Sequence, residues 1–121
     1  MDSAQAIAPG LEGSVERVVD DTLVTRHVGG DGVFGTPHMI LLMEQASHAA
    51  VDPHLDPAQT TVGYEVCVRH LAPTLPGQTV VARAVLKEVS GNKLLCDVTC
   101  QEGEKLVGSG THRRAIVGAR G

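Results

Sequence analysis

Residues 33–51, VFGTPHMILLMEQASHAAV, join a helix start signal to a long apolar run, and this combination decides the fold. Thr36 can accept hydrogen bonds from the first free amides, and Pro37 suits the first helical position. Pro53 then ends the helix. At about 100° per residue, apolar side chains cover almost the whole circumference. We therefore expect a buried helix at the centre of the fold.

Glu44 is the one acidic residue within this helix. Burying an ionised carboxylate without partners costs roughly several kcal/mol, so a sequence that keeps one among apolar neighbours is expected to use it. Two uses are open at this point. Glu44 either takes part in chemistry or forms an ion pair with an arginine such as Arg69.

The segments on either side of the helix have strand character. Residues 14–28 are rich in Val and Thr and predict a strand, which the glycines at 29–32 end. After the helix, alternating runs separated by turns at Pro76-Gly77, Gly91-Asn92 and Gly103 predict four more strands. These strands span residues 60–72, 78–90, 93–101 and 104–117. This order is typical of an α+β fold in which a curved antiparallel sheet wraps around one long helix.

Length and composition limit the function. The chain has 121 residues, enough for one domain, which we place at 14–118 after a flexible lead-in at 1–13. Its net charge is −4 and its only aromatic residues are Phe34 and Tyr64, so nucleic acid is not an expected partner. A core without large aromatic side chains often gains buried area by oligomerising, so we expect a homo-oligomer.

The potential metal ligands lack the spacing of metal sites. Three cysteines are present without such spacing, which predicts reduced thiols in a cytoplasmic protein. Four histidines also lack it, and no metal or other cofactor is expected. No apolar run approaches the ~20 residues that span a bilayer, so no membrane association is expected. These residues are Cys67, Cys96, Cys100, His38, His48, His54 and His112.

The strand at residues 60–71 supplies a second polar candidate. Strict alternation places Val62, Tyr64, Val66, Val68 and His70 on one face, and Thr61, Gly63, Glu65, Cys67 and Arg69 on the other. His70 therefore lies on the apolar face, where it can form an acid/base pair with Glu44. The alternative is a core histidine whose hydrogen bonds are satisfied structurally.

Three segments resemble the hotdog-fold thioesterases of the fluoroacetyl-CoA thioesterase type. They are VFGTPHMILLMEQA at 33–46, TTVGYEVCVRHLAPTLPGQTV at 60–80 and VGSGTHRRAIV at 107–117. The resemblance runs from about residue 33 to residue 117 without obvious gaps. It implies a hotdog fold, hydrolysis of an acyl-CoA or acyl-carrier thioester, and a homodimer or a dimer of dimers.

The resemblance also assigns roles to residues. It implies Thr36, Glu44 and His70 as the catalytic set, and Gly63 and Arg114 as substrate-binding residues. Phe34, just before the helix, is a further substrate-binding candidate. Each has a plainer explanation as well: Thr36 as a helix cap, Gly63 as a packing residue, and Arg114 as an edge charge or a contact to the phosphates of CoA.

The expected mechanism leaves the first bond open. Glu44 attacks the thioester or activates water, His70 relays a proton, and Thr36 orients the attacking group or is itself the nucleophile. The Gly63 amide is a candidate oxyanion donor. Thr36 and Glu44 are about 12 Å apart if the helix is regular, so either Thr36 lies in a non-helical entry or residues of two subunits converge.

One departure from the family concerns selectivity. The fluoroacetyl-specific enzymes carry a phenylalanine lid before the catalytic helix, whereas residues 27–32 here read HVGGDG. We therefore expect a more open mouth and no selectivity for fluoroacetyl-CoA. Two rival functions share the pocket: a non-catalytic protein that binds acyl-CoA or another small ligand, and a hotdog hydratase or dehydratase.

Overall fold

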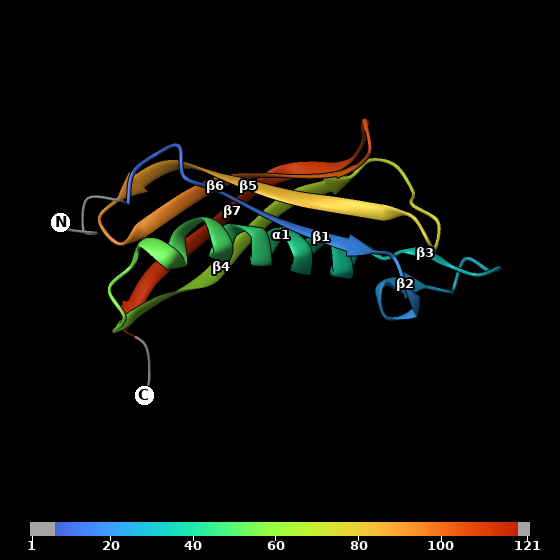
Figure 1. The fold of residues 1–121 in the computed structure, drawn as a ribbon, viewed down its shortest axis with the longest axis horizontal. Helices are drawn as coiled ribbons and strands as arrows, with labels where there is room; N and C mark the ends of the chain where they lie inside the picture. The colour runs from blue at the N-terminus through green and yellow to red at the C-terminus, as the bar shows by residue number, and fades with distance from the viewer. Residues whose placement is uncertain (1–6, 119–121) are drawn as a thin grey trace.

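The computed structural model describes residues 7–118. One helix of 16 residues, α1 (Thr36–Val51), lies along one face of a five-stranded antiparallel sheet (Figure 1). In order across the sheet, the strands are β1 (Glu12–Val18), β5 (Thr79–Ser90), β6 (Lys93–Glu102), β7 (Lys105–Gly118) and β4 (Gln59–His70). The predicted α+β architecture is confirmed, with the helix and sheet arranged as the hotdog resemblance implies.

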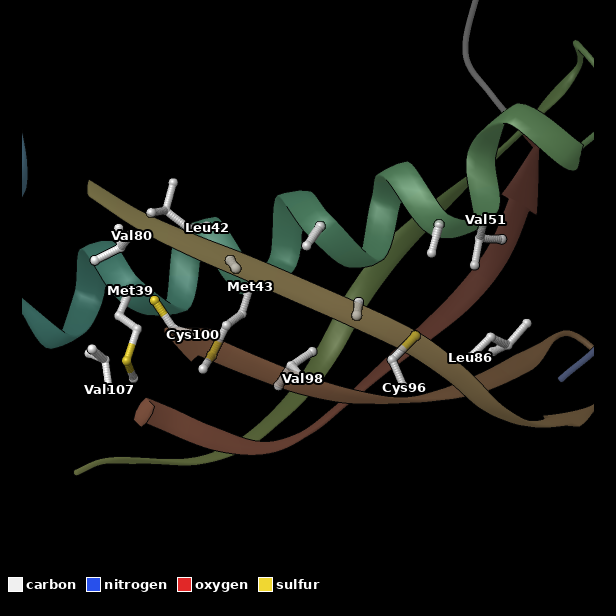
Figure 2. Close-up of a cluster of buried hydrophobic side chains, with 14 of the residues drawn as sticks. Met39, Leu42, Met43, Val51, Val80, Leu86, Cys96, Val98, Cys100 and Val107 are labelled. Atoms are coloured by element: carbon white, nitrogen blue, oxygen red, sulfur yellow. The ribbon is translucent and has the colours of Figure 1, made fainter. Parts of the chain in front are cut away.

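Alternate residues of the sheet form the core with one side of α1. Figure 2 shows Met39 and Met43 of the helix reaching toward the strands. Each fully buried side chain of this size contributes about 1.5–3 kcal/mol to folding. The buried core residues of these elements are Met39, Leu42, Met43, Ala46, Ala50 and Val51 of α1, Val80, Ala82, Ala84 and Leu86 of β5, Leu94, Cys96, Val98 and Cys100 of β6, and Val107 of β7.

The expectation that α1 is buried all round is wrong. Its far side is open in the single chain: Leu41 is 46% exposed, and Gln45, His48 and Ala49 are exposed too. The Glu44 side chain is 36% exposed. The sheet covers one face of the helix, so the apolar residues on the opposite face have no covering layer within the chain.

The predicted strand at residues 14–28 is correct only in part, because β1 ends at Val18. The Asp20 side chain accepts a hydrogen bond from the Thr22 amide at 2.9 Å and starts a short 3-10 helix, η2 (Asp21–Leu23). The chain then forms a two-stranded ribbon from β2 (Val24–Thr25) and β3 (Val33–Phe34). Figure 1 shows this ribbon at the end of the molecule where α1 begins.

The hairpins after the helix are confirmed. A 3-10 turn, η3 (Asp52–His54), follows α1, so the helix ends close to Pro53 as predicted. Ser90 pairs with Lys93 across the turn that contains Gly91, whose φ of 60° suits glycine. The observed strands differ from the predicted ranges by no more than two residues at either end.

A β-bulge in β4 changes which side chains face the helix. The pairing of β4 with β7 shifts between Gly63 and Glu65, which leaves Tyr64 as the extra residue. Thr61 and Gly63 therefore face α1 together with His70, which contradicts the strict alternation predicted from the sequence. Val62 and Tyr64, predicted to face the core, are 48% and 50% exposed.

The beginning of the chain packs against the sheet where it is described. Ile7 and Leu11 contact the core, and the Leu11 carbonyl accepts a hydrogen bond from the Leu86 amide at 2.8 Å. Residues 1–6 of the predicted lead-in lie outside the described residues, and the single-domain assignment for 14–118 stays a prediction. Among residues 7–118, no helix combines the length and apolar character needed to cross a membrane.

Gly13 allows β1 to approach the helix closely, which leads to a prediction about stability. A Cβ at this position would lie 2.8 Å from the Ala49 carbonyl carbon and would collide with the backbone of Ala46 and Ala50. Because backbone atoms cannot move aside, we expect Gly13→Ala to lower the free energy of unfolding by about 1–3 kcal/mol in urea titrations. Gly118→Ala is the control, since nothing lies near its added Cβ. Equal stability of the two variants would contradict this account.

Candidate active site

Thr36 and His70 meet at the start of α1. The residue that caps the helix is Gly35, which offers no side chain, so the explanation of Thr36 as the helix cap is wrong. The Thr36 hydroxyl instead lies 2.8 Å from Nδ1 of His70, which comes from the end of β4. A hydroxyl within hydrogen-bonding distance of an imidazole is the geometry of an activated nucleophile or of an oriented water site.

The surroundings of His70 keep its imidazole neutral. Burial lowers the pKa of His70 below its ordinary value. The Phe34 ring packs edge-on against the imidazole, with 5.9 Å between ring centroids. Within the described part of the chain, Nε2 of His70 is buried and has no hydrogen-bond partner. A neutral imidazole can accept a proton, so His70 can serve as a base at neutral pH.

A cavity opens beside this pair, under the β2–β3 ribbon. Residues of the ribbon, of the segment between its strands and of the helix start line it: Thr25, His27, Val28, Val33, Phe34, Thr36, His70 and Pro73. The Thr25 hydroxyl and Nδ1 of His27 lie 2.7 Å apart at its edge. The cavity thus holds three of the predicted site residues, Phe34, Thr36 and His70.

The other three predicted site residues line a second cavity farther along the helix. Glu44 shares it with Gly63 and Arg114. A Cβ at Gly63 would lie 3.1 Å from Oε2 of Glu44, so glycine lets the strand pass close to the carboxylate. The suggested ion pair of Glu44 with Arg69 is wrong, because Arg69 is exposed on the opposite face of β4.

Arg114 is a buried residue and not an edge charge. It is 7% exposed, and its Nε donates to the Thr61 hydroxyl at 2.8 Å while Nη2 donates to the Thr61 carbonyl at 2.9 Å. Burial lowers the pKa of Arg114, and the nearby Asp52 and Glu44 carboxylates oppose that shift. An arginine of this kind stays charged, so the cavity beside Glu44 holds a fixed positive charge.

Three residues of this site were not identified from the sequence. His112 lies between Arg114 and Glu44, with its Nε2 at 4.0 Å from Oε2 of Glu44. Thr61 joins Arg114 to Asp52, whose Oδ1 accepts from the Thr61 hydroxyl at 2.9 Å. One sequence signal could have identified His112: in a strand, residues two apart share a face, so His112 and Arg114 point the same way.

The structure therefore brings the predicted residues together as two groups. Thr36, His70 and Phe34 form the first, and Glu44, Gly63 and Arg114 form the second. Thr36 belongs to the regular helix, so its distance from Glu44 is about 12 Å along the axis at about 1.5 Å per residue. The non-helical entry considered for Thr36 is thus excluded.

Cysteines and other metal ligands take no part in either group. Burial raises the pKa of the Cys100 thiol to about 11 and also raises that of Cys96. Cys67 is exposed, and all three thiols are free. Within residues 7–118, no three His, Cys, Asp or Glu side chains gather as a metal site would require.

The neutral histidines predict how stability depends on pH. Burial lowers the pKa values of both His70 and His112 in the folded state, while the unfolded chain keeps values near 6.5. The unfolded chain therefore binds more protons just below pH 6.5, so the free energy of unfolding falls as the pH drops through this window. Urea titrations between pH 7 and pH 5 measure this slope, which should be shallower in His70→Asn. A free energy that is flat or rises on acidification would contradict the assignment.

Comparisons with known proteins now bear on the site. The sequence matches the family model of the fluoroacetyl-CoA-specific thioesterases over residues 18–120. The fluoroacetyl-CoA thioesterase of Streptantibioticus cattleyicolor is 42% identical over 85 residues, which cover 70% of this chain and 61% of that protein. The match thus spans less than two thirds of the relative's length.

Solved structures give the same relationship. A mutant of the fluoroacetyl-CoA-specific thioesterase FlK, in complex with fluoroacetate and CoA, superposes with a TM-score of 0.83 at 34% identity, covering 93% of this chain and 96% of the other. A hot-dog-like protein from Thermanaerovibrio acidaminovorans superposes with a TM-score of 0.86 at 20% identity, covering 98% and 90%, and shares the fold. The chain has the hotdog fold and belongs to the fluoroacetyl-CoA-specific thioesterase family.

Proposed function

We propose that this protein hydrolyses an acyl-CoA thioester to the free acid and CoA. The observation that carries the proposal is the 2.8 Å contact between the Thr36 hydroxyl and the neutral His70 imidazole, in a member of a thioesterase family. The complex of a related thioesterase with fluoroacetate and CoA supports CoA as the thiol. The reaction needs no metal or other cofactor, and the reduced thiols are consistent with a cytoplasmic enzyme.

In the proposed reaction, the two groups of residues divide the work. His70 takes the proton of the Thr36 hydroxyl, whose oxygen attacks the thioester carbonyl as CoA thiolate leaves. Glu44 then removes a proton from water, which attacks the acyl ester and releases the acid and Thr36. The Gly63 amide and Arg114 face the cavity where negative charge develops on the carbonyl oxygen.

The same division indicates how the enzyme is assembled. Thr36 and Glu44 lie on one rigid helix, so a single acyl group cannot touch both within one chain. The exposed face of α1 and the exposed Val62 and Tyr64 at the outer strand β4 offer apolar area to a second copy. We propose a homodimer, alone or paired with another, in which Glu44 of one subunit faces the Thr36–His70 pair of its partner.

The role of Glu44 predicts the effect of one substitution. Glu44→Gln keeps the size of the side chain but removes the base, so kcat should fall by about 10²–10⁴-fold. Release of free thiol from short-chain, branched and aromatic acyl-CoAs measures the loss. Glu104→Gln, on the exposed turn between β6 and β7, is the matched control and should retain full activity.

The outcome separates the rival functions. Unchanged turnover in Glu44→Gln would remove this residue from the mechanism. A wild-type protein that binds CoA esters but releases no thiol from any of them is a binding protein. A product that keeps its thioester identifies a hydratase or dehydratase.

The composite site predicts rescue between two inactive variants. Glu44→Gln and His70→Asn homodimers should each be inactive, but mixed dimers contain one site in which both residues are native. Unfolding and refolding the two together should restore roughly a quarter of wild-type activity, because half of the dimers are mixed and one of their two sites works. No recovery, with mixed dimers verified by mass spectrometry, would mean that each site is built from one chain.

The segment before the helix bears on the acyl group. Gly29 and Gly30 have positive φ values and leave open space around them, and His27 reaches the edge of the cavity where the fluoroacetyl-specific enzymes have a phenylalanine lid. We therefore propose that fluoroacetyl-CoA is not the preferred substrate. Its kcat/KM should lie within about tenfold of that for acetyl-CoA, less than a shape-selective pocket achieves. A preference of several hundredfold would contradict this proposal.

A further inference from the structure

His112 is held as one tautomer by its two neighbours. It is 1% exposed on β7, and its Nδ1 lies 2.8 Å from the Glu65 carbonyl, next to the bulge of β4. A carbonyl oxygen only accepts hydrogen bonds, so Nδ1 carries the proton. On the other side, Nη1 of Arg114 lies 3.1 Å from Nε2 of His112. Guanidinium groups only donate, so Nε2 must be the unprotonated acceptor.

Protonation of His112 would break this arrangement. Nε2 would become a donor facing the donor of Arg114, without a closer acceptor. The groups around the imidazole are Glu44 of α1, Arg114 of β7, Cys96 of β6 and the Glu65 carbonyl of β4. Burial lowers the pKa of His112 and the Arg114 charge adds to that effect, while Glu44 opposes it.

The imidazole completes the fixation of Arg114. A guanidinium has five N–H donors. Thr61 accepts from Nε and Nη2, and His112 accepts from Nη1, so every nitrogen is held and one hydrogen on each terminal nitrogen remains for another partner. Arg114 also lines the cavity of Glu44 and Gly63. Without His112, the Nη1 end of the guanidinium has no acceptor.

The same ring supports the floor of that cavity. A Cβ at Gly63 would lie 2.7 Å from Cε1 of His112, so the imidazole lies directly behind the strand at this glycine. Oε2 of Glu44 is 4.0 Å from Nε2 of the ring. His112 therefore contacts or approaches all three residues of this half of the site.

We infer that His112 is a positioning residue of the thioesterase site: as a neutral Nδ1–H imidazole, it orients Arg114 toward the acyl-CoA substrate. The inference rests on the proposed function. It predicts an effect on substrate binding that passes through the acceptor at Nε2. A histidine that only filled space in the core would be replaceable by any side chain of similar volume.

Two substitutions separate these roles. Gln can place its carbonyl oxygen near the position of Nε2, whereas Leu fills the space without an acceptor. We expect His112→Leu to lower kcat/KM about 10- to 100-fold, mainly through KM, and to weaken binding of the thioether analogue of acetyl-CoA by a similar factor. His112→Gln should recover most of that loss. His54→Leu, outside both cavities, is the control and should match the wild-type protein.

A measurement on the wild-type protein supports the test even if a variant does not fold. Long-range ¹H–¹⁵N correlation spectra, with His112 assigned, should show the proton on Nδ1 at neutral pH. A proton on Nε2, a folded His112→Leu protein with wild-type KM and analogue affinity, or a Gln variant as weak as the Leu variant would each overturn the inference. Loss of thiol release alone, with the tautomer and the variant-dependent analogue binding intact, would instead overturn the proposed hydrolysis.

Discussion

The close contact between α1 and the sheet is the constraint on which the rest of the structure depends. Alanines at the middle of the helix and of β5 are fully buried, and Gly13 brings β1 equally near. Small residues on both sides set a short distance between the layers, and a twisted sheet can keep that distance only by curving around the helix. This curvature carries β7 and β4 to the flank of α1 that bears Glu44 (Figure 1). The acid is therefore placed against a strand without leaving the helix.

The electrostatic design of the two groups differs. At the start of the helix, His70 is neutral and has one strong partner, the Thr36 hydroxyl, so a proton can move between them. Around Glu44, the charges are many and fixed: a buried guanidinium, a neutral imidazole and the carboxylate of Asp52 behind Thr61. The first environment suits proton transfer, and the second suits holding a charged or polarised group in one place. Separation along one rigid helix keeps these environments from neutralising each other.

The sequence predicted the elements that depend on local signals. Prolines bounded α1, and glycines with positive φ marked the hairpins, because both act through their own backbone. The bulge at Tyr64 has no comparable signal, since it arises from the pairing of β4 with β7, and it reversed the faces of Thr61 and Val62. The same non-local pairing creates the contact of His112 with the Glu65 carbonyl. For Thr36, the local rule favoured a helix cap, and only the position of β4 showed that the hydroxyl faces an imidazole.

The bulge also gives the protein a single optical label. The chain has one tyrosine and no tryptophan, so its ultraviolet fluorescence arises from the ring of Tyr64. That ring is half-exposed on the outermost strand of the sheet, and the Lys93 ammonium lies 4.8 Å from its centre. The emission therefore reports on this edge while the aliphatic core stays silent. A second chain arriving at β4, or a shift in its register, would change the colour and polarisation of the light from this one residue without any added dye.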